Sequence, residues 1–135
     1  MDTILVSSGI LPPALKALQQ HWQVVDIPNQ REALAWLQQC QTRPLAVAVG
    51  YASPTNAPKE DLTAQSMLQA IQKLDPTLPV IVTTGTSSIP VVVDLIKRGA
   101  FDYVIEASRP NQGSDIERYT QDLLLAFTRA TQMRQ

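Results

Sequence analysis

Residues 78–107 read LPVIVTTGTSSIPVVVDLIKRGAFDYVIEA, and this stretch decides the fold. It begins with a short apolar run, Pro79–Val82, and ends with a second one, Tyr103–Ile105. Pro90 and Gly99 bound the segment between the runs, and proline favours the start of a helix while glycine favours its end. The stretch therefore predicts a strand, a helix and a second strand in succession.

The same alternation extends over the rest of the chain. Three more apolar runs rich in β-branched residues come earlier, at Thr3–Val6, Gln23–Ile27 and Leu45–Val49, and such runs are typical of strands buried on both faces of a parallel sheet. The other expected helices are 14–20 after two prolines, 31–41 with Asn29 as N-cap, 61–74 with Asp61 as N-cap, and 114–133. Five strands, each followed by a helix, predict a parallel sheet with helices on both faces.

Composition excludes several classes of protein. The 135 residues are expected to form one domain, 1–135, in which the polar residues from about 128 suit either a chain end or a connector to an output domain. Eleven Lys and Arg against twelve Asp and Glu leave a net charge of −1 with no basic block, which argues against nucleic acid as a partner. No apolar run approaches the roughly 18 residues of a membrane span, and the first residues, MDTILVSSG, lack the charged start of a secretory signal, so we expect a cytoplasmic protein. One cysteine and one histidine provide neither an internal disulfide nor a zinc site.

Three markers stand at fixed spacing within residues 78–107. The run PVIV leads to Thr84, Gly99 follows fifteen residues later, and the sequence GAFDY begins at that glycine. This pattern resembles the second half of a response-regulator receiver domain, the CheY-like module that accepts a phosphoryl group in two-component signal transduction. Upstream, TILVSS, NQREALAWLQ and LAVAVGYASP resemble the first strand, second helix and central strand of that family, so the likeness covers about residues 3–130. It implies a flavodoxin-like (βα)5 three-layer sandwich with parallel strand order 2-1-3-4-5.

At the positions where the family has acidic residues, the resemblance implies that this chain has residues that are not acidic. The paired acids that hold Mg²⁺ correspond to Ser7 and Ser8. The phosphoacceptor aspartate corresponds to Gly50, or to Val49 if the loop gap is placed differently. No Asp or Glu lies in 3–25 or 33–59, so a shift in alignment does not restore a carboxylate.

Of the remaining family positions, two match the family pattern and two do not. The switch threonine corresponds to Thr84 and the switch aromatic to Tyr103, for which we favour simple packing over a two-position switch. The phosphoryl-binding lysine corresponds to Glu106, which reverses the charge, and the following cis-proline corresponds to Ala107. Aspartyl phosphorylation needs a carboxylate nucleophile and a Mg²⁺ ion held by hard oxygen ligands. The chain therefore resembles a pseudo-receiver that lacks the phosphoacceptor, with no cofactor, no metal and no enzymatic activity.

We expect such a module to act in two-component signalling or transcription control through protein–protein contact. In receivers the fourth helix, fifth strand and fifth helix form a common interaction face, and its partner would be a protein, an output domain or a second copy of the chain. The face would carry Val92, Lys97, Arg98, Asp102, Tyr103 and Arg118.

The alternative is a small-molecule or anion sensor. Hydroxyl side chains should gather at the carboxyl ends of the strands, where such folds bind ligands. They are Ser7, Ser8, Ser53, Thr83, Thr84, Ser87 and Ser88. Serine and threonine are also common in turns, where they bond their own backbone. Within this group Glu106 either bonds Ser7 or Ser8 or is a solvated carboxylate at a strand end.

Overall fold

The computed structural model of the chain describes residues 2–7, 12–41, 43–51, 63–85, 89–106 and 113–134. The strands are β1 (Thr3–Ser7), β2 (Gln23–Asp26), β3 (Val47–Tyr51), β4 (Val80–Thr84) and β5 (Asp102–Ile105). The helices are α1 (Pro12–Gln19), α2 (Gln30–Gln39), α3 (Ala64–Leu74), α4 (Ile89–Lys97) and α5 (Gly113–Arg134). Strands and helices alternate along the chain, as the sequence predicts.

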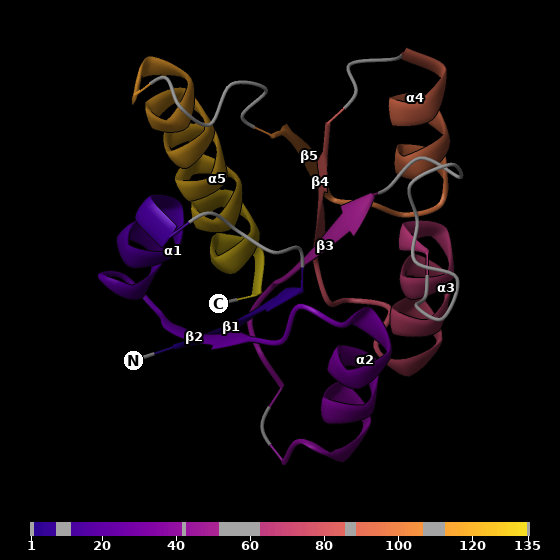
Figure 1. Cartoon of the computed structure of the whole chain (residues 1–135). Helices are drawn as coiled ribbons and strands as arrows, with labels where there is room; N and C mark the ends of the chain where they lie inside the picture. The colour runs from indigo at the N-terminus through magenta and orange to yellow at the C-terminus, as the bar shows by residue number, and fades with distance from the viewer. Residues whose placement is uncertain are drawn as a thin grey trace.

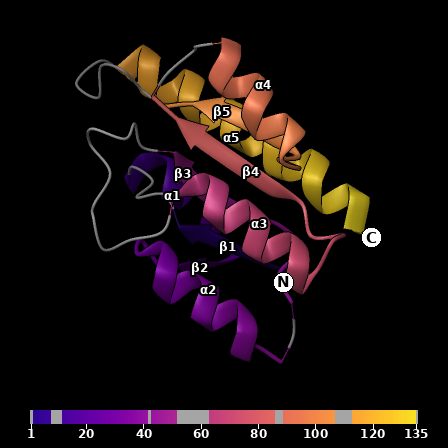
Figure 2. The same cartoon turned by 90° about the vertical axis from the view of Figure 1, so that its right-hand side faces the viewer.

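The five strands form one parallel sheet in the order β2-β1-β3-β4-β5. Helices α1 and α5 cover one face of this sheet, and α2, α3 and α4 cover the other (Figure 1). The view turned by 90° has α2 and α3 in front of the sheet and α5 behind it (Figure 2). The predicted flavodoxin-like (βα)5 fold and strand order are confirmed.

Two hydrophobic layers, one on each face of the sheet, hold the structure together. In β1, Ile4 and Val6 pack toward α1 and α5, whereas Leu5 between them packs toward α2 and α3. All three side chains are fully buried. Successive side chains of a strand point to opposite faces, so a strand covered on both sides must be apolar throughout. This requirement explains the near-continuous apolar runs of the sequence.

Strand β3 begins and ends two residues later than the sequence suggests. Gly50 and Tyr51 pair with Thr83 and Thr84 of β4, which extends the ladder beyond the apolar run. The expected end of this strand at Val49 was therefore wrong. The apolar run gave no sign of this, because Gly50 has no side chain to pack and is held in the sheet by its pairing with the neighbouring strand.

Helix ends follow the expected capping chemistry with one exception. Asn29 caps α2 as predicted, and its side chain accepts a hydrogen bond of 2.9 Å from the backbone N–H of Glu32. Helix α3 is capped by Thr63, whose hydroxyl accepts from the N–H of Ser66 at 3.1 Å. The expected cap at Asp61 was wrong, since the helix begins only at Ala64, and Asp61 itself lies outside the described residues.

Gly99 ends α4 as the sequence predicts. The N–H of Gly99 donates to the carbonyl of Ile96 at 3.0 Å, and that of Ala100 donates to Leu95 at 3.1 Å. These two bonds form a Schellman motif, which needs a left-handed residue at the glycine position. Gly99 has φ of 108°, and a Cβ there would also collide with the side chain of Gln72 from α3. The turn places β5 beside β4.

The two hydrophobic layers predict that two nearby leucines of α5 contribute very differently to the free energy of unfolding. Leu123 is fully buried in the layer beneath α1, whereas the side chain of Leu125 is 53% exposed. We expect Leu123→Ala to lower the free energy of unfolding by about 2–5 kcal/mol. Leu125→Ala, the matched control, should change it by no more than about 0.5 kcal/mol. Urea denaturation of both variants measures this, and equal losses would contradict the packing described here.

Candidate functional site

The predicted phosphoacceptor positions meet at the carboxyl edge of the sheet. The strand register pairs Ser7 with Val49, Gly50 with Thr83, and Thr84 with Ile105. Glu106 directly follows β5, and its backbone N–H donates to the carbonyl of Thr84 at 2.8 Å. The structure therefore brings these positions to one edge, where parallel sheets bind ligands. Ser8, Ser53, Ser87, Ser88 and Ala107 lie outside the described residues.

The position expected for the phosphoacceptor, Gly50 or Val49, presents backbone rather than a nucleophilic side chain. Val49 is fully buried in the layer under α2 and α3, and Gly50 follows it within β3, one residue before the strand ends at Tyr51. The side-chain amide of Gln30 donates a hydrogen bond of 2.8 Å to the carbonyl oxygen of Gly50. Gln30 is the first residue of α2 and is itself buried, placed there by the Asn29 cap.

Sequence reasoning missed Gln30 entirely. A glutamine in the first turn of an amphipathic helix carries no signal that separates it from an ordinary solvated residue. Only the crossing of α2 over the end of β3 turns its amide toward the Gly50 carbonyl.

Three hydroxyl side chains at this edge are withdrawn from solvent. Ser7, Thr83 and Thr84 are each fully buried. The hydroxyl oxygens of Ser7 and Thr83 have no hydrogen-bond partner within the described part of the chain. Of the alternatives open for Glu106, a bond to Ser7 is therefore not formed, and Ser8 lies outside the described residues. Buried polar groups without a partner are rare in folded proteins, so these two hydroxyls require an explanation.

The carboxylate of Glu106 is half-buried rather than solvated. Burial raises its pKa above the ordinary value of 4.5, because removal from water disfavours the charged form. The nearby hydroxyl of Thr83 opposes this increase in pKa, although the two groups form no hydrogen bond of ordinary geometry. A Cβ atom at Gly85 would lie 3.9 Å from Oε2 of Glu106, so the carboxylate lies over the end of β4.

Tyr119 of α5 lies close to the same carboxylate. Its side chain is buried in the layer between the sheet and α5. Burial raises the pKa of Tyr119 to about 12, and the charge of Glu106 adds to the increase. The phenol therefore stays neutral at physiological pH and provides no charge compensation for Glu106.

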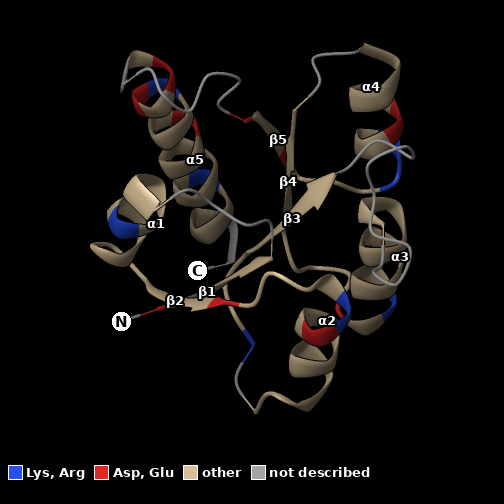
Figure 3. Cartoon of the chain, in the orientation of Figure 1, with Lys and Arg blue, Asp and Glu red and all other residues tan. Residues whose placement is uncertain are grey.

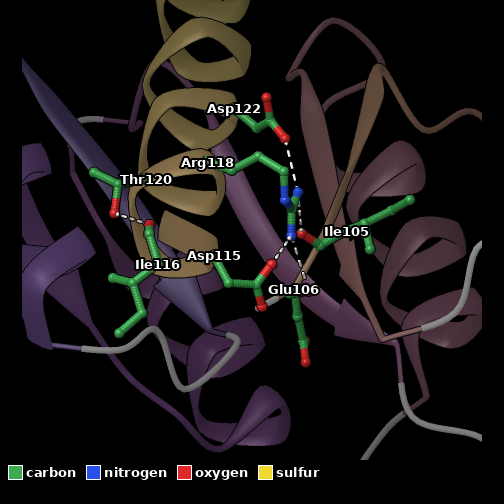
Figure 4. Close-up of polar contacts among 7 residues, drawn as sticks. All are labelled: Ile105, Glu106, Asp115, Ile116, Arg118, Thr120 and Asp122. Carbon is green, nitrogen blue, oxygen red and sulfur yellow. Dashed lines mark hydrogen bonds and ion pairs between the residues drawn. The ribbon is translucent and has the colours of Figure 1, made fainter. Parts of the chain in front are cut away.

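Arg118 does not neutralise Glu106 either. Its guanidinium forms ion pairs with Asp122 at 3.0 Å and Asp115 at 3.4 Å. It also donates to the backbone carbonyls of Ile105 at 3.3 Å and of Glu106 at 3.4 Å (Figure 4). In the same view the side chain of Glu106 points away from the guanidinium. Arg118 thus fixes the end of β5 to α5, and no ion pair among the described residues includes the Glu106 carboxylate.

The donor set at this edge does not fit Mg²⁺. The receiver resemblance implies a magnesium ion held by paired acids, whereas this chain has Ser7 and Ser8 at those positions, and Ser8 lies outside the described residues. Among the described residues no three His, Cys, Asp or Glu side chains gather into a metal-binding group. Magnesium prefers several hard oxygen ligands, including carboxylates, and one glutamate is a poor substitute.

A second candidate site lies on the other side of the molecule from α2, where α4, β5 and α5 form what we term the edge face. Five large apolar side chains there are exposed: Ile89, Val93, Ile96, Tyr103 and Leu125. The first three are spaced i, i+4 and i+7 on α4, which places them on one side of the helix. Tyr103 and Leu125 line a groove of about 360 Å³ between β5 and α5, together with Asp102, Val104, Ile105, Asp122, Ala126 and Arg129.

Charged side chains surround these apolar residues. Acidic and basic residues both occur on α4 and α5 (Figure 3). Lys97 and Arg98 are exposed at the end of α4, and Arg98 pairs with Asp94 at 2.9 Å. Asp102 accepts a hydrogen bond of 2.8 Å from the N–H of Tyr103. Val92, which the sequence also placed on this face, is half-buried.

Comparison with solved structures identifies the fold. A CheY-like receiver domain protein from Methanospirillum hungatei JF-1 aligns with a TM-score of 0.73 and 19% identity over 99% of this chain and 96% of its own. A receiver domain protein from Clostridium thermocellum aligns with a TM-score of 0.72 and 23% identity over 98% and 95%. The fold is that of a response-regulator receiver domain.

The receiver fold here also occurs as one part of longer proteins. NtrX from Brucella abortus aligns over 98% of this chain but only 27% of its own length, with 22% identity and a TM-score of 0.73. No protein-family model matches the sequence, and no curated protein matches it. Within the described residues, no helix is both long and apolar enough to cross a membrane.

The half-buried Glu106 carboxylate predicts a pH-dependent gain in stability when it is neutralised. Because the folded-state pKa lies above the unfolded value, Glu106 favours folding at low pH, and this contribution is lost as pH rises through the folded-state pKa. Glu106→Gln should therefore raise the free energy of unfolding at pH 7 and change it less at pH 4.

Denaturant titrations at the two pH values measure this difference. The same substitution at Glu117, an exposed residue of α5, serves as the control and should give no such dependence on pH. Loss of stability in Glu106→Gln at pH 7 would show that the carboxylate makes a favourable contact.

Proposed function

We propose that this chain is a receiver-like regulatory module that works without aspartyl phosphorylation and acts by binding a protein through its edge face. The setting would be two-component signal transduction or transcription control. The main support for this proposal is the hydrogen bond between Gln30 and the backbone carbonyl of Gly50. It lies at the place where a receiver presents its phosphoacceptor carboxylate.

The chemistry at the sheet edge supports the absence of phosphotransfer. Glycine offers no nucleophile for attack on a phosphoryl group. Glu106 would repel the phosphoryl oxygens that a lysine at this position attracts. Serine hydroxyls at the acid positions leave the charge of the transferred group without a metal to balance it. The proposal therefore assigns no catalytic residue.

The composition of the edge face supports a protein partner. The large apolar side chains most exposed in the described part of the chain all lie on α4, β5 and α5. A group of apolar side chains within a polar rim is typical of interaction sites. The rim contains both positive and negative charges, from Lys97, Arg98, Asp102 and Arg118. Such a rim suits either a separate output domain or a second copy of the chain.

Treatment with acetyl phosphate and Mg²⁺ tests the first part of the proposal. Because no carboxylate stands at Gly50, the intact mass of the chain should not change, whereas an active receiver treated in parallel should gain one phosphoryl group. A gain of one phosphoryl group by this chain would overturn the proposal.

A crosslinking experiment tests the second part. A photocrosslinking amino acid at Ile96 should give a defined protein adduct in cells, and the same group at the exposed Lys73 of α3 should not. With the purified partner, Ile96→Asp should raise the Kd by about tenfold or more, because a charge would be buried in an apolar contact. An unchanged Kd, or equal adducts from both positions, would argue against the edge face.

A further inference from the structure

Arg118 joins the last strand of the sheet to the helix that follows it. One terminal nitrogen of its guanidinium donates to the backbone carbonyl of Ile105 at 3.3 Å, and the other donates to that of Glu106 at 3.4 Å. The same two nitrogens contact Asp122 at 3.0 Å and Asp115 at 3.4 Å. These acids lie one turn to either side of Arg118 on α5, so they flank the guanidinium on the side that faces β5 (Figure 4).

The contacts of Arg118 use all the donors at the tip of its side chain. Each terminal nitrogen of a guanidinium has two N–H groups, and each terminal nitrogen of Arg118 has two acceptors within the chain. A partner that bonded to this tip would have to displace an acceptor that is already in place. The geometry therefore suits a contact within the chain better than one across an interface.

The same contacts lie at one end of the groove between β5 and α5. Ile105 and Asp122, which both bond to Arg118, also line this groove. β5 is an edge strand of the described sheet, so β4 holds it on one side, where the N–H of Glu106 donates to Thr84 at 2.8 Å. On its other side, the end of the strand is bonded to α5 through Arg118.

We propose that Arg118 is a positioning residue of the edge face, which keeps the end of β5 at a fixed distance from α5 and so maintains the groove for the partner. The role toward the partner rests on the function proposed above, whereas the contacts belong to the chain alone. An exposed ion pair contributes little by itself, but here one planar group joins two carbonyls and two carboxylates. Lysine keeps the charge but has a single nitrogen, so it cannot reproduce these contacts.

Hydrogen exchange of the whole chain, without a partner, measures how firmly the end of β5 is held. In Arg118→Lys the amide of Glu106 should exchange about fivefold faster or more, because the end of the strand opens more easily. The amide of Leu5, which bonds within the interior of the sheet, should exchange at the same rate in both proteins. Arg129→Lys, a matched substitution on α5, should leave both rates unchanged, since no ion pair of the described residues includes Arg129. An unchanged rate for Glu106 in Arg118→Lys would overturn the inference.

Binding of the purified partner distinguishes positioning from direct contact. Arg118→Lys should raise the Kd by about threefold or more, because the groove is held less firmly although the charge is kept. A residue that acted on the partner through its charge alone would be replaced by lysine without loss, so an unchanged Kd would contradict the inference. Absence of an adduct from Ile96 would count against the proposed function, whereas an unchanged exchange rate at Glu106 would count against Arg118 even if a partner is captured.

Discussion

The pairing of β3 with β4 is the interaction on which the sheet edge depends. It sets Gly50 beside Thr83 and Tyr51 beside Thr84, and so fixes where both strands end. From β4 the register passes to β5, which places Glu106 next to Thr84. Each side chain of the candidate site is held by this ladder of backbone hydrogen bonds. A slip of one residue would turn every one of these side chains to the opposite face of the sheet.

Charge is the second constraint, and it acts at one position. The receiver resemblance implies a lysine at the position of Glu106, and this reversal of charge would change what the edge of the sheet attracts. The surrounding groups do not offset the reversal, since Thr83 and Tyr119 are neutral and Arg118 is engaged elsewhere. The proposed absence of phosphotransfer rests in part on this reversal of charge.

At the exposed edge of β5, backbone groups are kept from pairing with another strand, while side chains remain accessible. Asp102 accepts from the N–H of Tyr103, and Arg118 donates to the carbonyl of Ile105. These bonds occupy backbone groups that would otherwise pair with another strand, a common protection of edge strands. What remains accessible beside β5 are side chains, Tyr103 and Leu125 among them. The edge face is thus suited to side-chain recognition rather than to strand addition.

The sequence by itself determined the alternation of strands and helices, the caps at Asn29 and Gly99, and the absence of Asp and Glu from residues 3–25 and 33–59. These features follow from local patterns, namely apolar periodicity, capping residues and the identity of single residues. The family resemblance added the strand order and the positions of the site. Only the tertiary structure decided the end of β3, the contact of Gln30 with Gly50, and the burial of Glu106 beside Thr83. The reason is that each of these depends on a partner distant in sequence, and a local pattern contains no information about the strand or helix that will lie against it.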